Sequence, residues 1–446
     1  MSSKQGGKTG LYFKSSFIQY FHIRPGTIFQ CEPLNIDNSK TLCFLIWADD
    51  LVVLSESENG LKNMLQNLSI YADENRIKIN SSKTKCMIFN KTGRFLRRSF
   101  KVGQEIIYTT NNYKYLGFIM TPSGEINTGL KDLKDRALRA YYSLKNKMGH
   151  YFMLCPSTSI HLFDSLIKPI LLYNSDFWGC HKMSENNPIE NVHIRFCKEL
   201  LGVQRQTTNI GVLLEMGRIP IMHYAIKNCI KNWSRIHIIG KANEMVLLSH
   251  QMSLNCSLKW SEGVKSCLDR SGIGSQNNNK AIHNMIFKRM TDIFYQEAFT
   301  KINSVNSKLR TFAKLKTNIG IAKYLTQIKC IQNRVALSKI RLSNHDLMIE
   351  KGRHLKIDKT ERFCPFCPNI IETESHFLLQ CKTFSFLRRL LFAEIKIIVP
   401  TFNQICDQDK FLILLNNENI ANQVGDFINK ALNCRRFLLN KPKYPI

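Results

Sequence analysis

Two adjacent carboxylates, Asp49 and Asp50, separate a pair of apolar runs in the stretch "LCFLIWADDLVVLS", residues 42–55. Carboxylates on rigid elements can bind the divalent ions that bring a hydroxyl group against a phosphate in phosphoryl transfer. Because successive strand side chains point to opposite faces, a tight turn is needed to present one aspartate and leave the other beside it. The alternative is an ordinary Asp-Asp turn, since aspartate favours turns through its own hydrogen bonds.

Four residues near the C-terminus have the spacing of a metal site. Cys364, Cys367, His376 and Cys381 follow the pattern C-x2-C-x8-H-x4-C. A knuckle between the first two cysteines and a helical turn before the last can complete a tetrahedron of three thiolates and one imidazole, which leaves no position for water. The pattern predicts a structural Zn²⁺ site worth on the order of 10 kcal/mol to folding. The alternative is three buried cysteines and an unrelated histidine.

The elements that must hold these residues indicate an α+β fold. Between residues 41 and 125, apolar runs of strand length alternate with polar turns. These runs are "TLCFLIW", "LVVLS", "TKCMIFN" and "KYLGFIM". One helix is expected to begin near Ser57, and its apolar face consists of Leu61, Met64, Leu65, Leu68 and Ala72.

From residue 126 onward the apolar periods are helical, with breaks expected at Pro156, Pro169, Pro188 and Pro220. A seam with alternating spacings of three and four predicts one long helix. Its members are Leu130, Leu133, Ala137, Tyr141, Leu144 and Met148. "SGIGSQNNNK", residues 271–280, is the best candidate for a linker, because glycine and asparagine disfavour helix and strand.

The charge balance favours a polyanionic partner. The sequence has 63 Lys and Arg against 34 Asp and Glu, a net charge of +29, which predicts salt-dependent binding to nucleic acid. An acidic membrane surface is the alternative, but no apolar run approaches the roughly 20 residues that span a bilayer. We therefore expect no membrane partner.

The fifteen cysteines are an odd number and lie mostly in apolar segments, which is typical of reduced, buried thiols. The N-terminal stretch also lacks the features of a secretory leader. The expected location is intracellular. The choice between nucleus and cytoplasm stays open, because "RFLRRSFK", residues 94–101, fits both a weak import signal and a basic turn.

Three motifs follow one another in a familiar order: "WADD", then "IKINSSKTKCMIF" at residues 77–89, then "YKYLGFIM" at residues 113–120. Together they resemble the last three palm motifs of non-LTR (LINE-type) retrotransposon reverse transcriptases, although Trp47 replaces the usual tyrosine or phenylalanine. The resemblance implies that Asp49 binds Mg²⁺ or Mn²⁺ and that Asp50 is its less critical neighbour. It further implies that Lys83 lies near the phosphates of the incoming nucleotide, and that Tyr115, Leu116 and Gly117 form the turn that supports the primer end.

The helical region resembles the thumb that follows such a palm. The long helix carries Lys131, Lys134, Arg139 and Lys145 outside its apolar seam, and these cations could grip the backbone of a template–primer duplex. The alternative is a solvated cationic face.

The segments "RLSNHDLMIEKGRHLK" and "ETESHFLLQC" resemble the C-terminal cysteine-histidine segment of many LINE-type proteins. Four arginines flank the cysteines and were open to two interpretations, contact with nucleic acid or simple exposure. They are Arg353, Arg362, Arg388 and Arg389.

A reverse transcriptase palm also needs an aspartate from an earlier strand, a Gln-Gly loop and basic fingers. Upstream of Asp49 the only acids are Glu32 and Asp37, and "NIDNSK" is expected to be a loop. No endonuclease pattern of the family is recognisable either. We therefore expect the C-terminal portion of a LINE-type reverse transcriptase from a 5′-truncated element, which is inactive alone.

The expected domains are an unassigned segment (1–40), a partial palm (41–125), a helical thumb (126–236), a further helical region (237–330) and a zinc-binding region (331–446). The expected partners are an RNA template, a DNA primer and the element's own RNA. The competing hypothesis is a non-catalytic nucleic-acid-binding protein built from thumb and zinc segment. A group II intron maturase shares the aromatic-Ala-Asp-Asp motif, but the zinc pattern argues against it.

Overall fold

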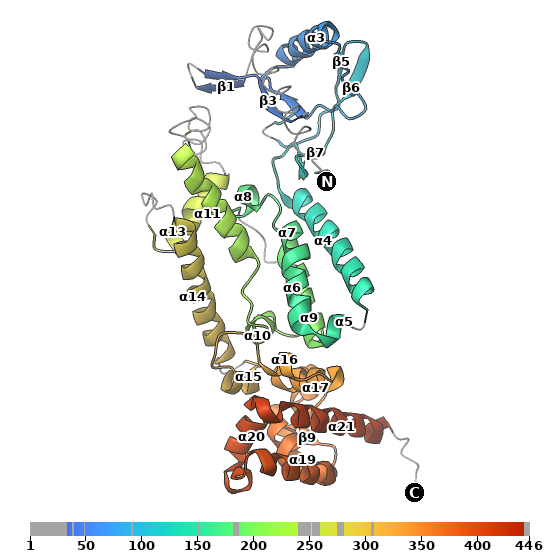
Figure 1. The fold of residues 1–446 in the computed structure, drawn as a ribbon, viewed down its shortest axis with the longest axis vertical. Helices are drawn as coiled ribbons and strands as arrows, with labels where there is room; N and C mark the ends of the chain where they lie inside the picture. Colours follow the sequence, from blue (N-terminus) through green and yellow to red (C-terminus); the bar gives the residue numbers. More distant parts are fainter. Residues whose placement is uncertain are drawn as a thin grey trace, which may run out of the picture. The chain divides into compact units, whose positions relative to one another are not determined.

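The computed structural model describes residues 34–37, 40–48, 50–90, 92–149, 151–181, 187–239, 251, 259–273, 281–304 and 307–440 (Figure 1). The fold is α+β, as predicted, with many helices and small two-stranded antiparallel sheets. The chain divides into two compact units. The first comprises Met1–Asp132 and Trp233–Glu262, and the second comprises Leu133–Asn232 and Gly263–Ile446.

Among the described residues of the first unit, residues 34–120 form four β-hairpins and one helix. The hairpins are β1 (Leu34–Asp37) with β2 (Lys40–Leu42), β3 (Phe44–Trp47) with β4 (Asp50–Val53), β5 (Ser99–Val102) with β6 (Glu105–Tyr108), and β7 (Tyr113–Tyr115) with β8 (Phe118–Met120). Helix α3 (Glu58–Glu74) packs its apolar face on β5–β6, where Phe100 and Ile107 are buried, and Phe44 and Leu51 of β3–β4 join this core.

Helix α3 begins where the sequence predicted. Ser57 is the N-cap, and its hydroxyl accepts a hydrogen bond from the amide of Gly60 at 2.9 Å, which satisfies one of the free amides of the first turn. The predicted face is confirmed: Met64, Leu65, Leu68 and Ala72 are buried and Leu61 is half-buried.

Two predictions of local structure in this unit are wrong. Residues 35–37 of the expected loop "NIDNSK" belong to strand β1. The run "TKCMIFN" is not a strand, because Cys86 alone makes a bridge, with Thr109. Hairpin β5–β6 was not predicted, although Gly103, with φ of 61°, occupies its two-residue turn. A glycine with positive φ at this point is a recognised hairpin signal.

The second unit is almost entirely helical, and α4, α11 and α13 extend across both units. Its helices are α4 (Asn127–Met148), α5 (Tyr151–Leu154), α6 (Pro156–Leu162), α7 (Lys168–Leu171), α8 (Ser175–Trp178), α9 (Pro188–Leu201), α10 (Asn209–Glu215), α11 (Met222–Ile239), α13 (Lys259–Arg270), α14 (Ile282–Ile302), α15 (Arg310–Leu315), α16 (Tyr324–Gln327), α17 (Ile331–Arg341), α18 (Met348–His354), α19 (Ser385–Ile398), α20 (Asp407–Asn416) and α21 (Ala421–Asn440).

The proline positions mostly mark helix starts, as expected. Pro156 and Pro188 occupy the first turns of α6 and α9, and Pro220 precedes α11. The break expected at Pro169 is wrong. A π-helical turn, η1 (Phe163–Ile167), joins α6 to α7, and this wider turn carries the helix past Pro169.

The seam of α4 is confirmed: Leu130, Leu133, Ala137 and Tyr141 are at most 1% exposed. Of the expected linker, Ser271 to Ile273 leave the end of α13 in a turn, and residues 274–280 lie outside the described residues. Among the described residues, no helix is both long and apolar enough to cross a bilayer.

The C-terminal part of the second unit contains a further hairpin, β9 (Phe363–Cys364) with β10 (Cys367–Ile371), and a π-helical turn, η3 (His376–Gln380). Helix α17 packs along α21. The buried pair of Arg341 and Glu215, with Nε and Oε1 2.6 Å apart, ties α17 to α10.

Candidate functional site

The first two cysteines of the candidate metal centre lie opposite each other in a hairpin. Cys364 ends β9, Cys367 begins β10, and the two are register partners. A two-residue turn therefore brings both side chains to the same end of the hairpin, which is the knuckle expected from the C-x2-C spacing.

The other two residues lie at the two ends of η3. The amide of Cys381 donates to the carbonyl of His376 at 2.8 Å, which closes a π-type turn. The hydroxyl of Thr373 accepts from the amide of His376 at 3.0 Å and fixes the start of the turn. Local backbone bonding thus holds His376 and Cys381 together.

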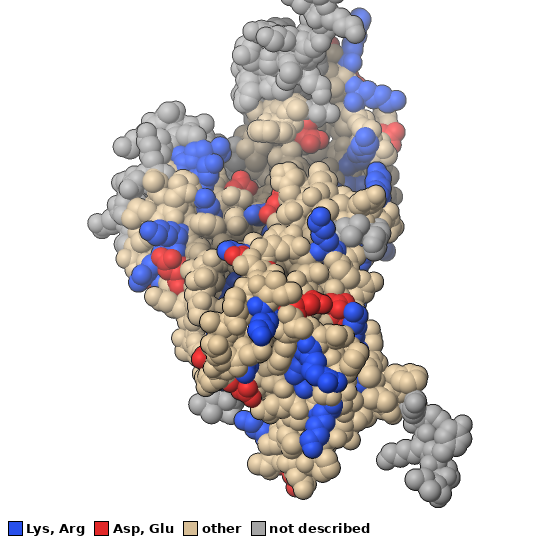
Figure 2. Space-filling view, turned by 60° about the horizontal axis from the view of Figure 1, so that its bottom comes forward, with Lys and Arg blue, Asp and Glu red and all other residues tan. Residues whose placement is uncertain are grey.

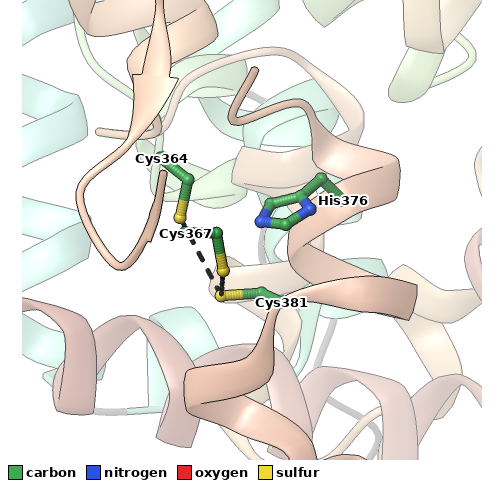
Figure 3. Close-up of side chains that lie close together, drawn as sticks. All are labelled: Cys364, Cys367, His376 and Cys381. Atoms are coloured by element: carbon green, nitrogen blue, oxygen red, sulfur yellow. Dashed lines mark hydrogen bonds between the residues drawn. The ribbon is translucent and has the colours of Figure 1, made fainter. Parts of the chain in front are cut away.

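The four side chains converge on one point (Figure 3). Their potential ligand atoms all lie within 4.8 Å of one another, and the sulfur of Cys381 is 3.9 Å from that of Cys364 and 3.9 Å from that of Cys367. A tetrahedral ion with metal–sulfur bonds of about 2.3 Å separates its sulfurs by about 3.8 Å, whereas a disulfide needs about 2 Å. The spacing therefore fits a metal ion.

The donor set also fits. His376 is 3% exposed, yet neither ring nitrogen makes a hydrogen bond of normal geometry. Buried polar atoms without partners are rare in folded proteins, and a metal ion would satisfy one of these nitrogens. Among the described residues, this is the one cluster of three or more side chains placed to hold an ion.

Burial favours the neutral forms of Cys364, His376 and Cys381. It raises the pKa of Cys364 to about 12, raises the pKa of Cys381, and lowers the pKa of His376. A divalent ion must therefore displace thiol protons when it binds, which makes its affinity depend on pH.

Two of the four flanking arginines make hydrogen bonds inside the fold. Neither contact with nucleic acid nor simple exposure describes them. Arg388 is buried and donates to the carbonyl oxygens of Leu378 and Cys381, both at 2.8 Å. Arg362 is half-buried and donates to the carbonyls of Ile357 and Ile349. The other two, Arg353 and Arg389, are exposed.

Two buried glutamates hold the segment that carries His376. Glu372 accepts two hydrogen bonds from Arg435 of α21, at 2.8 and 2.6 Å. Glu374 accepts from Arg310 of α15 at 2.6 Å and lies 3.1 Å from His345. The sequence analysis missed both anchors; the only local signal is a pair of acids in a segment that also carries a metal ligand.

Asp50 begins β4, directly after the turn that follows β3. Trp47 pairs with Asp50 across the hairpin, Ala48 has a φ of 55°, and Asp49 lies outside the described residues. The side chains of Trp47 and Asp50 are exposed. The hairpin therefore presents Asp50 at its tip.

The predicted primer-end turn is a tight turn. Leu116 and Gly117 have φ of 45° and 80° and connect β7 to β8. Burial and then the negative charge of Asp50 raise the pKa of Tyr115. The structure thus brings Tyr115 within electrostatic reach of the aspartate turn.

Lys83 lies in an exposed turn after α3. Its amide donates to the carbonyl and the side-chain oxygen of Asn80, both at 3.2 Å, and the hydroxyl of Thr84 donates to the same carbonyl. Short-range bonds to Asn80 therefore fix the turn, and the Lys83 side chain points to solvent.

The predicted cations of α4 differ in their surroundings. Lys131 and Arg139 are exposed and Lys134 is half-buried. Lys145 forms an ion pair of 2.7 Å with Glu199, which also accepts from Tyr141. On the face shown in Figure 2, Lys and Arg side chains are more common than Asp and Glu, in keeping with the net charge of +29.

One known family matches the segment that contains the aspartate turn. Residues 5–120 match the family described as reverse transcriptase (RNA-dependent DNA polymerase). This match covers 116 of the 446 residues of the chain. The reverse transcriptase segment contains the β3–β4 turn, α3, Lys83 and the β7–β8 turn. It begins upstream of residue 41, where the motifs placed the start of the palm, and ends close to residue 125.

The chain is also similar to a putative uncharacterized transposon-derived protein of Caenorhabditis elegans, with 25% identity over 170 residues. The alignment takes in 37% of this chain and 59% of the relative. The chain thus spans less than two thirds of that relative's length.

Proposed function

We propose that the chain is part of an RNA-directed DNA polymerase of a non-LTR (LINE-type) retrotransposon and that it holds an RNA template and a DNA primer. The observation that carries the proposal is the aspartate turn of β3–β4 inside the reverse transcriptase segment, with Tyr115 in its electrostatic field. The transposon-derived relative supports the assignment to a mobile element.

The proposed roles follow the positions of the residues. Asp49 holds a divalent ion, Asp50 lies beside it, and Lys83 pairs with the phosphates of the incoming nucleotide. Tyr115, Leu116 and Gly117 support the primer end. When bound, Mg²⁺ or Mn²⁺ supplies the positive charge that offsets the reacting phosphates.

We further propose that this chain alone binds template and primer without extending the primer. A two-metal site needs a carboxylate from another strand, and the acids of this sequence upstream of Asp49 are Glu32 and Asp37. Of these two, Asp37 is the last residue of strand β1.

The C-terminal cluster is proposed to hold a structural Zn²⁺ ion. Its support is the 3.9 Å spacing of the sulfurs, the unpartnered imidazole of His376 and the two buried glutamates that fix the ligand segment. With four protein ligands the ion has no open position, so its contribution is to folding.

The test is fluorescence anisotropy with a labelled RNA template annealed to a DNA primer, across a series of salt concentrations. The proposal expects binding that weakens steeply with salt and is unchanged in Asp49→Ala, because phosphate contacts supply the affinity. Absence of binding by folded, metal-loaded protein would contradict it. Asp73→Ala, an exposed aspartate of α3, is the matched control.

A further inference from the structure

Arg388 is a buried cation whose hydrogen bonds go to backbone carbonyls. Its guanidinium donates to Leu378 and Cys381 at 2.8 Å and to Phe377 at 3.3 Å, and no carboxylate among the described residues pairs with it. By contrast, Arg341 and Arg435 each pair with a buried glutamate. A buried charge without a counter-ion is costly.

The metal centre supplies the missing negative charge. Three thiolates, one neutral imidazole and one divalent ion sum to a single net negative charge, since three minus two leaves one. Arg388 bonds to the carbonyl of Cys381, so its cation lies next to a ligand of this centre.

We propose that Arg388 is the counter-cation of an anionic metal–thiolate centre and thereby sets how tightly the centre holds its ion. The inference rests on the proposed metal site. Arg388 acts through the ligands and is a positioning residue. The positive charge of Arg388 offsets the single negative charge of the loaded centre. Arg388 therefore stabilises a divalent ion bound by three thiolates more than the same ion bound by fewer thiolates.

The experiment compares metal affinity in the full chain with two substitutions that separate charge from hydrogen bonding. Arg388→Lys keeps the charge and loses the planar fork, whereas Arg388→Gln keeps amide donors and loses the charge. Co²⁺ is titrated into metal-free protein against a chelator, and its visible absorption reports tetrahedral thiolate coordination. Zn²⁺ is then measured by displacement of Co²⁺.

We expect Arg388→Gln to weaken Co²⁺ and Zn²⁺ binding by roughly 10- to 100-fold, as loss of an outer-sphere partner does, while Arg388→Lys stays within a few-fold of the unmodified chain. Equal losses in both variants would overturn the counter-cation role, and so would unchanged affinity in Arg388→Gln. An unmodified chain that binds neither ion would instead overturn the proposed metal site itself.

Arg334→Gln is the matched control. Arg334 is also buried and donates to backbone carbonyls, those of Ile328 and Met153, neither of which belongs to the ligand segment. Its substitution should leave Co²⁺ affinity unchanged, and a loss equal to that of Arg388→Gln would overturn the proposal.

A second variant covers the case in which Arg388→Gln does not fold. Cys367→His makes the loaded centre neutral, so the Arg388→Lys and Arg388→Met substitutions in that background should differ little in Co²⁺ affinity. The same two substitutions should differ clearly when all three cysteines are present. An equal difference in both backgrounds would overturn the proposal.

Discussion

At the scale of single residues, the ligands of the C-terminal cluster carry the most specific chemistry. Cys364→Ser removes one of three thiolates from a site with no spare ligand. We expect zinc affinity to fall by more than 100-fold and the free energy of unfolding to fall by several kcal/mol, because metal binding and folding are coupled. Metal analysis and thermal unfolding measure the two effects.

Cys406→Ser is the matched control, because Cys406 is an exposed cysteine of the same unit. A chelator should reproduce the effect of Cys364→Ser on the unmodified chain and add little to the variant. Zinc retained at one ion per chain in Cys364→Ser would contradict the assignment of the ligands.

Glu374 provides a prediction about pH. Burial alone would raise its pKa, but the hydrogen bond from His345 and the charges of His345 and Arg310 hold the pKa at about 2. Because the folded value is below the ordinary value of 4.5, the ionised carboxylate stabilises the fold fully above pH 4.5, and this stabilisation is lost as pH falls toward 2.

Glu374→Gln should therefore lower the free energy of unfolding by about 2–4 kcal/mol at pH 7, and the difference from the unmodified chain should narrow at pH 3. Urea unfolding with a chelator present at both pH values keeps metal loss out of the comparison. If the difference in free energy of unfolding between Glu374→Gln and the unmodified chain grows as pH falls, the assigned ion pair is contradicted. Glu361→Gln, at an exposed glutamate, is the control.

At the scale of elements, α4 carries three predicted thumb cations that are exposed or half-buried. The combined change of Lys131, Lys134 and Arg139 to alanine removes three charges and leaves the apolar seam intact. We expect template–primer affinity to fall by about one to two orders of magnitude at moderate salt, with a shallower dependence on salt, because fewer counterions are released.

Lys145 is left out of this set because Glu199 already pairs with it. The control changes three exposed lysines on other helices to alanine: Lys265 of α13, Lys301 of α14 and Lys314 of α15. Equal losses in the two triple variants would show that net charge alone drives binding and that α4 has no special role.

Elements fixed by short-range chemistry were predictable from the sequence. Helix α3 is an example, since its cap and apolar face lie within one segment. The short distance between Cys364 and Cys367 was predictable for the same reason, because both lie in one hairpin. The strand expected around Cys86 failed because apolar character without a partner strand does not make a ladder.

The supports of the metal centre could not be predicted, because they join residues far apart in the chain. Glu372 and Arg435 are separated by 63 positions, and Arg310 and Glu374 by 64. Arg388 was also misjudged, since its burial depends on three carbonyls that only the folded π-helical turn brings together.

At the scale of the whole molecule, the chain combines a reverse transcriptase segment, a basic helical region and a compact cysteine-histidine centre. A net charge of +29 favours contact with nucleic acid along much of the surface. We propose that the helical region binds the template–primer and that the aspartate turn binds the catalytic divalent ion. The ion site needs one more carboxylate.

Primer extension on a poly(rA) template with an oligo(dT) primer tests this account most directly. The purified chain is assayed with Mg²⁺ and with Mn²⁺, beside Asp49→Ala and Asp37→Ala. The account predicts that zinc-loaded protein binds the template–primer and that none of the three extends it. Primer extension by the unmodified chain that is lost in Asp49→Ala would contradict the prediction. If extension is also lost in Asp37→Ala, Asp37 is the carboxylate that completes the site.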